Sequence, residues 1–312
     1  MAATQQRAPA DPRDQPEAPA AERVRVLTRF SGLLHRHPGL RLAGLLTPPM
    51  AWLVLAYLGA LVVMFAAAFW SVDSFSGNLI RVVTTDNLKV LAEESVYRTI
   101  ALRTLGVAIA VTLIDVALAV PMALYMAHVA SRRMRGVLVA AVLTPLWASY
   151  LVKAYAWRAM LAADGVVNWA LNPVGVHGPG FGLVATTLTL AYLWLPYMIL
   201  PVYAGLERIS PSLLEASSDL GATAWRTVRS VMLPLLFPAI VAGSIFTFSL
   251  SLGDYITVKI VGGKSQLFAN VIYDNIGVAG NLPFAAAAAF VPVVVVLVYL
   301  GLARRTGALD NL

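Results

Sequence analysis

The chain contains no cysteine, and only 12% of its 312 residues are charged. Without cysteine it has no disulfide framework, no thiolate metal site and no cysteine nucleophile. A soluble domain carries about 25% charged residues. This scarcity of charge, together with 59% hydrophobic residues and a mean hydropathy of +0.75, indicates a membrane protein.

The chain also lacks the residues that an enzyme active site would need. It has only four histidines, and no G-x-x-x-x-G-K-[ST] phosphate-binding loop occurs in it. No cluster of His, Asp or Ser stands at catalytic spacing, which argues against an integral-membrane enzyme. We therefore expect no enzymatic activity and no cofactor or metal in this chain.

The net charge of +7 raises the hypothesis of nucleic-acid binding. The distribution of the basic residues argues against it, because they lie beside the hydrophobic stretches, where the positive-inside rule places them. We expect the lipid bilayer, and no nucleic acid, as the surroundings of this chain.

Windows of about 20 apolar residues predict six transmembrane helices. These windows cover residues 42–70, 99–128, 137–157, 181–204, 235–260 and 283–302. Several contain proline, and packed neighbours in a helix bundle can satisfy the carbonyls that a proline leaves free. The sequence therefore predicts an all-α polytopic membrane protein, with six transmembrane helices in a domain spanning residues 42–305, some of them kinked.

The basic residues predict the orientation of these helices. On one side they stand before the first window, between the second and third, between the fourth and fifth, and after the sixth: Arg23, Arg25, Arg29, Arg36, Arg41, Arg132, Arg133, Arg135, Arg208, Arg226, Arg229, Arg304 and Arg305. On the other side Arg81, Lys89 and Arg98 are offset by acids. The positive-inside rule therefore predicts that both termini are cytoplasmic.

The N-terminal residues differ from the rest of the chain. Residues 1–21 are rich in Ala, Pro and Gln and are expected to form a disordered cytoplasmic tail. Residues 22–41 are expected to form an amphipathic helix in the membrane interface, with Phe30 and Leu33 on its apolar face and Arg29 on its edge. The alternative is a basic orientation signal without fixed structure. Residues 306–312 would form a second cytoplasmic tail.

A polar segment, residues 207–234, separates the fourth and fifth windows. Ser210 suits the N-cap and Pro211 the first turn of a short helix over residues 211–220. Gly221 can take a backbone conformation closed to other residues, so that a second helix, at about 222–231, can leave at an angle. An amphipathic connector without further function would be the simplest alternative.

Six positions in this segment have a fixed spacing: Glu215, Ala216, Gly221, Val231, Leu233 and Pro234. They resemble the coupling loop of ATP-binding-cassette (ABC) importer permeases, with the pattern E-A-A, three residues, Gly, nine residues, a branched aliphatic residue, any residue and Leu-Pro. Ser217 departs from it, because the family usually has a second Ala there.

The resemblance implies a permease of the type I ABC importer kind. Such a permease works with two cytoplasmic ATPase subunits, a second homologous permease and an extracytoplasmic substrate-binding protein. Glu215 would then pair with an arginine of an ATPase, although it could also serve as an acid favoured by the helix dipole. A secondary transporter or channel without ATPase would have no use for such a loop.

Two further stretches narrow the substrate class. Residues 145–161, PLWASYLVKAYAWRAML, and residues 251–263, SLGDYITVKIVGG, resemble permeases of spermidine/putrescine-type importers. The resemblance implies import of a polyamine-like cation. Iron, thiamine, opine and phosphonate importers share these motifs, so another small solute remains open.

Acids inside the apolar windows are candidates for the substrate pathway, because a buried charge is costly and usually faces a bundle interior or a water path. Asp115 and Asp254 are the two acids, and aromatic rings could add cation–π contacts to a polyamine: Trp147, Tyr150, Tyr155 and Trp157. The alternatives are a structural acid at Asp115, a helix cap at Asp254, and a belt of aromatics at the membrane interface.

Overall fold

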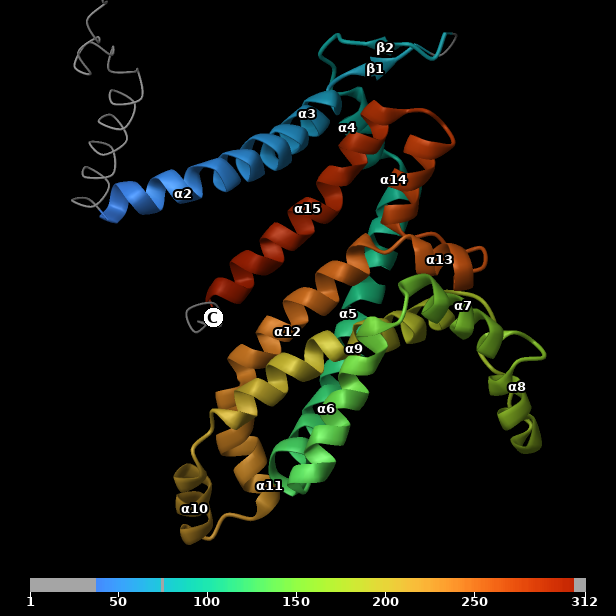
Figure 1. Ribbon diagram of the computed structural model, residues 1–312. Coiled ribbons are helices and arrows are strands. Elements are labelled where there is room, and N and C mark those ends of the chain that lie inside the picture. Colours follow the sequence, from blue (N-terminus) through green and yellow to red (C-terminus); the bar gives the residue numbers. More distant parts are fainter. Residues whose placement is uncertain (1–37, 74–75, 306–312) are drawn as a thin grey trace, which may run out of the picture. The chain divides into compact units, whose positions relative to one another are not determined.

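The computed structural model describes residues 38–73 and 76–305 (Figure 1). The tails expected at residues 1–21 and 306–312 lie outside these ranges, as does most of the interfacial helix expected at 22–41. Residues 38–41 belong to the first described helix instead. The chain divides into two compact units, residues 1–63 and 64–312.

The described part of the first unit is one apolar helical stretch. It consists of α2 (Pro38–Trp52), the π-helix η1 (Leu53–Leu58) and the beginning of α3 (Gly59–Ala67). The helical run Gly44–Ala67 is long and apolar enough to cross a membrane. It corresponds to the first predicted window.

In its described residues the second unit is helical apart from one small hairpin, in which β1 (Ser71–Val72) pairs antiparallel with β2 (Leu79–Ile80). The helices that follow are α4 (Asp86–Glu93), α5 (Ser95–Leu124), η2 (Tyr125–Val129), α6 (Arg132–Trp147), α7 (Tyr150–Leu161), α8 (Val166–Leu171), η3 (Asn172–Val174), α9 (Leu183–Glu207), α10 (Pro211–Asp219), α11 (Ala224–Thr227), η4 (Val228–Met232), α12 (Leu233–Gly253), α13 (Ile256–Val261), α14 (Phe268–Gly277) and α15 (Leu282–Arg305). The predicted all-α class is confirmed.

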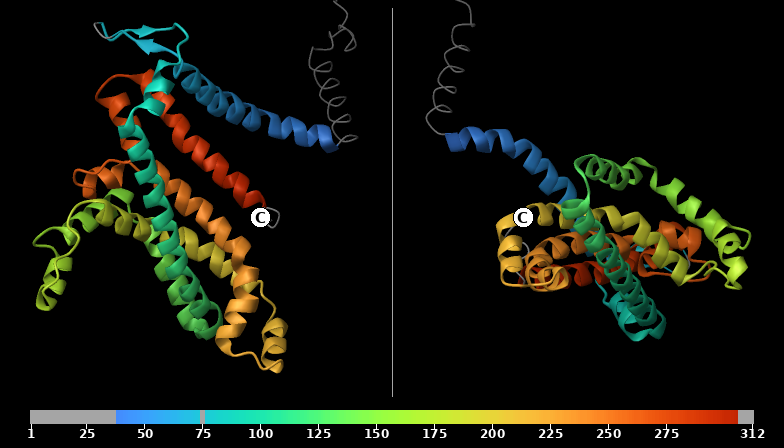
Figure 2. Two further views of the ribbon diagram at one scale, coloured as in Figure 1. Left: turned by 180° about the vertical axis from the view of Figure 1, so that it is seen from behind. Right: turned by 90° about the horizontal axis from the view of Figure 1, so that it is seen from below.

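Helices α5, α9 and α12 form the centre of the second unit and lie side by side in every view (Figures 1 and 2). Small residues let them approach closely. A Cβ added at Gly205 of α9 would lie 2.6 Å from the Cβ of Ala239 on α12, and one at Gly243 would lie 2.8 Å from the sulfur of Met198. Close packing of small residues is how helices associate in a membrane, where burial of apolar surface from water contributes little.

Five helices are long and apolar enough to cross a membrane, or six if the bent pair of α6 and the α7–η3 segment counts as one span, among the residues that the structure describes. The third predicted window, residues 137–157, contains a sharp break, because the chain bends by 98° after Trp147. Pro145 lies two residues before this break, and Ala148 and Ser149 are extended. Lys153 donates from Nζ to the carbonyl oxygen of Pro145, at 3.0 Å.

The fifth predicted window also differs from the structure. The helix starts at Ala224, passes through the π-helix η4 and stops at Gly253, seven residues short of the predicted end at residue 260. It stops because Asp254 is extended, with φ −79° and ψ 114°, and the chain then turns into α13.

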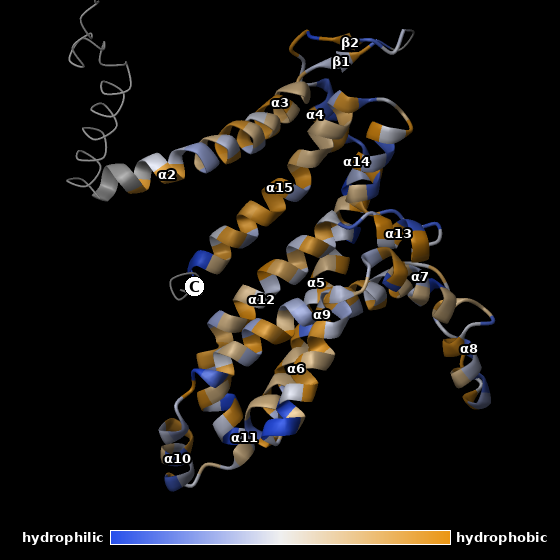
Figure 3. Ribbon diagram, viewed as in Figure 1, coloured by the Kyte–Doolittle hydropathy of each residue, from blue (hydrophilic) through white to orange (hydrophobic). Residues whose placement is uncertain are grey.

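Figure 3 shows hydrophilic residues at both ends of the second unit, and one of these ends is rich in arginine. There the start of α6, the helices α10 and α11, and the end of α9 meet, and they carry Arg132, Arg133, Arg208, Arg226 and Arg229. We call this the basic end. The hairpin β1–β2 and α4 lie at the other end of the unit (Figure 1).

Candidate functional site

Asp254 stands at the break between α12 and α13 and caps α13. Its Oδ1 accepts a hydrogen bond from the backbone N–H of Thr257 at 2.8 Å, and its Oδ2 accepts one from the hydroxyl of Thr257 at 3.1 Å. Only 7% of Asp254 is exposed. The capping role that the sequence left open is therefore present, and Thr257, which the sequence analysis missed, supplies both donors. An acid followed three residues later by a threonine was the available signal.

Tyr150 brings a second predicted pathway residue to Asp254. It begins α7, directly after the bend, and its hydroxyl donates a hydrogen bond to Oδ2 of Asp254. The same hydroxyl lies 2.6 Å from Oγ1 of Thr257. Trp194 of α9 stacks on the Tyr150 ring, with 6.0 Å between ring centroids and 20° between planes. Because the third span breaks after Trp147, Tyr150 begins a new helix and its hydroxyl reaches Asp254.

These side chains form part of the wall of a cavity of about 270 Å³, which we call the α12 cavity. Its lining residues come from α7, α9, the end of α12, the start of α13 and the break between these two: Tyr150, Trp194, Ser249, Leu250, Gly253, Asp254, Tyr255 and Ile256. A carboxylate beside aromatic faces attracts a cation by charge and by cation–π contact. The cavity is therefore suited to an ammonium group.

The other predicted pathway aromatics do not line the α12 cavity. Trp147 is 90% exposed, and Tyr155 is exposed as well. Trp157 packs instead against Tyr192, with ring centroids 5.5 Å apart. Exposed aromatics of this kind fit the alternative of an interface belt.

Asp115 lies inside the helix bundle rather than in the α12 cavity. It belongs to α5 and is completely buried, and neither of its carboxylate oxygens has a hydrogen-bond partner among the residues that the structure describes. The indole N–H of Trp194 is likewise without a partner there. A buried polar group without a partner is rare and costly, so Asp115 needs an explanation beyond packing.

The predicted short helix between the fourth and fifth spans is present as α10, which begins at Pro211. Ser210 occupies the N-cap position, but its side chain makes no capping bond and lies instead 2.5 Å from the hydroxyl of Ser212. Gly221 has φ +76°, the left-handed conformation for which glycine was expected. The second predicted helix is the start of the long run Ala224–Gly253, rather than a separate element.

The residues predicted to couple the loop 207–234 to an ATPase differ in their exposure. Glu215 and Ala216 are exposed, whereas Ser217 is buried. Glu215 lies beyond the first turn of α10, so the helix-dipole alternative has little support. Leu233 and Pro234 begin α12. The apolar side chains of Leu220 and Trp225, in the same loop, are exposed.

Arg135 joins three helices at the basic end, a role that the sequence analysis did not assign. Its Nε and Nη2 donate to the carbonyl oxygens of Met126, at 3.0 Å, and Ala127, at 2.7 Å, in the π-helix η2. Its Nη1 lies 3.9 Å from Oε1 of Glu207, the last residue of α9. The ends of α5, α6 and α9 are therefore tied together directly before the loop 207–234.

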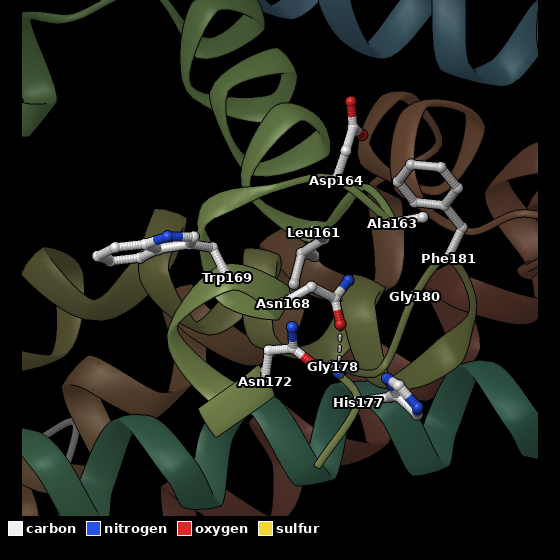
Figure 4. A pocket seen from close by; sticks show the side chains of 10 residues that line it. All are labelled: Leu161, Ala163, Asp164, Asn168, Trp169, Asn172, His177, Gly178, Gly180 and Phe181. Atoms are coloured by element: carbon white, nitrogen blue, oxygen red, sulfur yellow. Dashed lines mark hydrogen bonds between the residues drawn. The ribbon is translucent and has the colours of Figure 1, made fainter. Parts of the chain in front are cut away.

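A second, larger cavity of about 640 Å³ lies between α7, α8 and the loop that leads into α9 (Figure 4). Asn168 shapes it by donating to the carbonyl oxygen of Ala162, at 2.8 Å, and accepting from the backbone N–H of Gly178, at 2.7 Å. A Cβ at Gly178 would approach Asn168 to 3.1 Å. No sequence motif pointed to this cavity.

Comparison with known proteins shows which family this chain belongs to. Residues 108–305 match the family described as "Binding-protein-dependent transport system inner membrane component". The Inner membrane ABC transporter permease protein YdcU of Escherichia coli K12 is 42% identical over 301 residues, which cover 92% of this chain and 96% of YdcU. The Spermidine/putrescine transport system permease protein PotB of the same organism is 28% identical over 268 residues, which cover 84% of this chain and 96% of PotB.

A solved structure shows the same fold. A chain from the crystal structure of a bacterial alginate ABC transporter, in complex with an alginate pentasaccharide-bound periplasmic protein, superposes with a TM-score of 0.69 at 19% identity. The similarity covers 88% of this chain and 96% of that chain. Permeases of this family are not enzymes, and ATP hydrolysis belongs to a separate subunit. This chain belongs to the family of binding-protein-dependent inner-membrane components, as a permease subunit of an ABC importer.

Proposed function

We propose that this permease carries a polyamine-like cation, of the spermidine/putrescine class, across the inner membrane. The observation that carries the proposal is the hydrogen-bonded pair of Tyr150 and Asp254 in the wall of the α12 cavity. Asp254 supplies an acceptor for ammonium donors, and Tyr150, Trp194 and Tyr255 supply aromatic faces. The similarity to permeases named for spermidine and putrescine supports the same substrate class.

The pathway requires partners that this chain does not supply. We infer a second, homologous permease, an extracytoplasmic substrate-binding protein and two cytoplasmic ATPase subunits. The family description names a binding-protein-dependent system, and the alginate transporter of similar fold was solved with a periplasmic protein. The proposed orientation puts the basic end and both termini in the cytoplasm, in agreement with the positive-inside rule.

The loop 207–234 is the proposed contact with an ATPase. Its helix α10 presents the exposed carboxylate of Glu215, and Leu220 and Trp225 add apolar surface that is 89% and 69% exposed. An exposed anion and exposed apolar side chains in one loop suit a partner groove that contains an arginine. The bond from Ser217 to Thr227 would pass a movement of α10 on to the start of the run that contains α12.

Uptake of radiolabelled spermidine by the complete complex in proteoliposomes tests the proposed function. We expect ATP-dependent uptake in wild type. Asp254→Asn removes the charge at nearly constant volume and should lower uptake about tenfold or more, because a hydrogen bond to a charged group contributes about 1.5–3 kcal/mol.

The matched control is Asp164→Asn, which neutralises an exposed acid at the rim of the other cavity and should leave uptake unchanged. If wild type imports no polyamine but stimulates ATP hydrolysis with another solute, the substrate class is wrong. If Asp254→Asn imports spermidine as wild type does, the α12 cavity is not on the pathway.

A further inference from the structure

Lys259 of α13 reaches across to α14, where two different groups hold its ammonium. Its Nζ lies 2.5 Å from Oδ1 of Asp274 and 4.3 Å from the ring centroid of Tyr273. The first contact is a charge-assisted hydrogen bond and the second a cation–π contact. A carboxylate and an aromatic face around one ammonium are the elements of an alkylammonium-binding site.

This arrangement differs from the ordinary ion pair that the same chain offers on α4. Lys89 lies 3.6 Å from Asp86, one turn away on the same helix, and the side chains are 62% and 74% exposed. Surface pairs of that kind contribute little to stability. Lys259 and Asp274 come from different helices, their side chains are 41% and 34% exposed, and an aromatic ring contacts the cation.

Two stacked rings link the Lys259 site to the wall of the α12 cavity. The ring of Tyr273 stacks on that of Tyr255, with 4.5 Å between centroids and 19° between planes, and Tyr255 lines the α12 cavity. Asn270 donates from Nδ2 to the carbonyl oxygen of Tyr255 at 3.0 Å and so holds this residue in place. Two carboxylates, Asp254 and Asp274, are thus connected by stacked aromatic rings. Such a series matches a molecule with ammonium groups spaced along an apolar chain.

We propose that Asp274 and Tyr273 form a second ammonium-binding site, which Lys259 occupies here as an internal ligand and which an ammonium group of the substrate enters by displacing Lys259. This inference rests on the proposed function, since it assigns a second subsite to the same polyamine. The lysine side chain is itself a four-carbon chain that ends in an ammonium. Exchange with a polyamine replaces one ammonium–carboxylate contact by another, and the flexible Lys259 can turn into water.

Zero-length crosslinking tests this exchange in the complete complex in membrane vesicles. A water-soluble carbodiimide activates a carboxylate and joins it to a neighbouring amine as an amide, with the carbodiimide leaving as a urea. Without polyamine we expect an amide between Lys259 and Asp274. With spermidine this amide should decrease severalfold, and a spermidine amide should appear on Asp274, both measured by mass spectrometry of the peptides.

The pair Lys89–Asp86 provides the matched control, and sodium chloride at equal ionic strength controls for screening. Thr84 donates to Oδ2 of Asp86 at 2.6 Å. This bond, together with Lys89, holds the pKa of Asp86 below its ordinary value and favours the ionised carboxylate. Spermidine should modify Asp86 severalfold less than Asp274. Lys259→Met should increase the spermidine amide on Asp274 further, because the internal competitor is gone.

Either of two results would overturn the proposed second site. The first is equal modification of Asp86 and Asp274 by spermidine. The second is a loss of the Lys259–Asp274 amide with spermidine that is no greater than the loss with sodium chloride. Spermidine uptake measured in the same vesicles separates this result from the proposed function. Uptake without a spermidine amide on Asp274 leaves the function standing and removes the second site. A spermidine amide on Asp274 without uptake supports the site and removes the proposed function.

Discussion

The hydroxyl of Ser217 lies 2.9 Å from the hydroxyl of Thr227, and this bond joins α10 to the first turn of the helical run that contains α12. Ser217 is buried, although the helix around it is almost entirely exposed. The resembling coupling loops usually have alanine at this position, which cannot make the bond. At the one position where this chain departs from the pattern, Ser217 therefore makes a specific contact between α10 and the start of the helical run 224–253.

Thr227→Val tests this contact. The change removes the hydroxyl, keeps the shape and leaves the buried Ser217 without its partner, so we expect a loss of stability of about 1–3 kcal/mol. Thermal unfolding of the purified protein in detergent measures it. The double variant with Ser217→Ala should lose less than Thr227→Val alone, since no hydroxyl is then left unpaired. Ser218→Ala is the control, because that exposed hydroxyl bonds only within its own helix. A double variant less stable than Thr227→Val would contradict the role of the bond.

Gly221 allows a graded test of the turn in the same loop. A Cβ at this position would meet no atom within 4 Å, so a substitution is opposed by the backbone conformation alone. The left-handed conformation costs an L-residue about 1–2 kcal/mol, and asparagine tolerates it best. Spermidine-stimulated ATP hydrolysis of the complex should therefore fall in the order Gly221→Asn, Gly221→Ala, Gly221→Val. Gly136→Ala, in an open helical position, should have no effect. Equal activity of the three variants would show that the turn does not transmit coupling.

The helical class and the position of the loop 207–234 could be predicted because they depend on local properties. Apolar length, and a proline and a glycine at fixed spacing, were sufficient. The break after Trp147 could not be located, because a proline inside an apolar window bends or interrupts a helix according to its neighbours. Lys153, which binds the carbonyl of Pro145, is part of that context.

The same limit applies to the candidate site. Both Tyr150 and Asp254 were candidates, but their pairing depends on a bend and a helix end that are set by tertiary structure. Lys259 and Asp274 were not predicted at all. Lys259 lies in the stretch 251–263, but that stretch gave it no partner, and only the tertiary arrangement brings it to Asp274.

The absence of native cysteine makes the proposed orientation directly testable. Ser217 is buried, so cysteines at the exposed positions Arg133 and Ser218 are better probes of the basic end. Both should react with a membrane-impermeant maleimide only in inside-out vesicles. A cysteine at the exposed Asp86 should react only in right-side-out vesicles, because α4 lies at the other end of the unit. Labelling of Ser218→Cys from the outside would reverse the proposed orientation.

Tyr150→Phe tests the role of the Tyr150 hydroxyl separately from the role of its aromatic ring. The variant keeps the stacking on Trp194 and the bonds from Thr257 to Asp254, but Asp254 loses one donor. An ammonium could then bind Asp254 in place of the hydroxyl, so we expect tighter retention of spermidine and slower release, with the maximal uptake rate lowered severalfold. Initial rates of uptake over a range of spermidine concentrations measure this. Tyr155→Phe, exposed on the same helix, is the control and should behave as wild type. A Tyr150→Phe variant with wild-type rates would remove the hydroxyl from the mechanism.

Asp115 should show a conflict between stability and transport. Burying a carboxyl without a partner is costly, so Asp115→Leu, which fills a similar volume with apolar atoms, should raise the unfolding temperature of the purified protein. A residue kept at such a cost is expected to act in another state of the bundle, in which α5 and α9 separate and the carboxylate meets the passing cation. Asp115→Asn and Asp115→Leu should therefore both lower spermidine uptake about ten- to a hundredfold, the equivalent of about 1.5–3 kcal/mol for one lost charge-assisted contact. Uptake within twofold of wild type in Asp115→Asn would remove Asp115 from the pathway. A lower unfolding temperature for Asp115→Leu would show instead that the acid holds helices together.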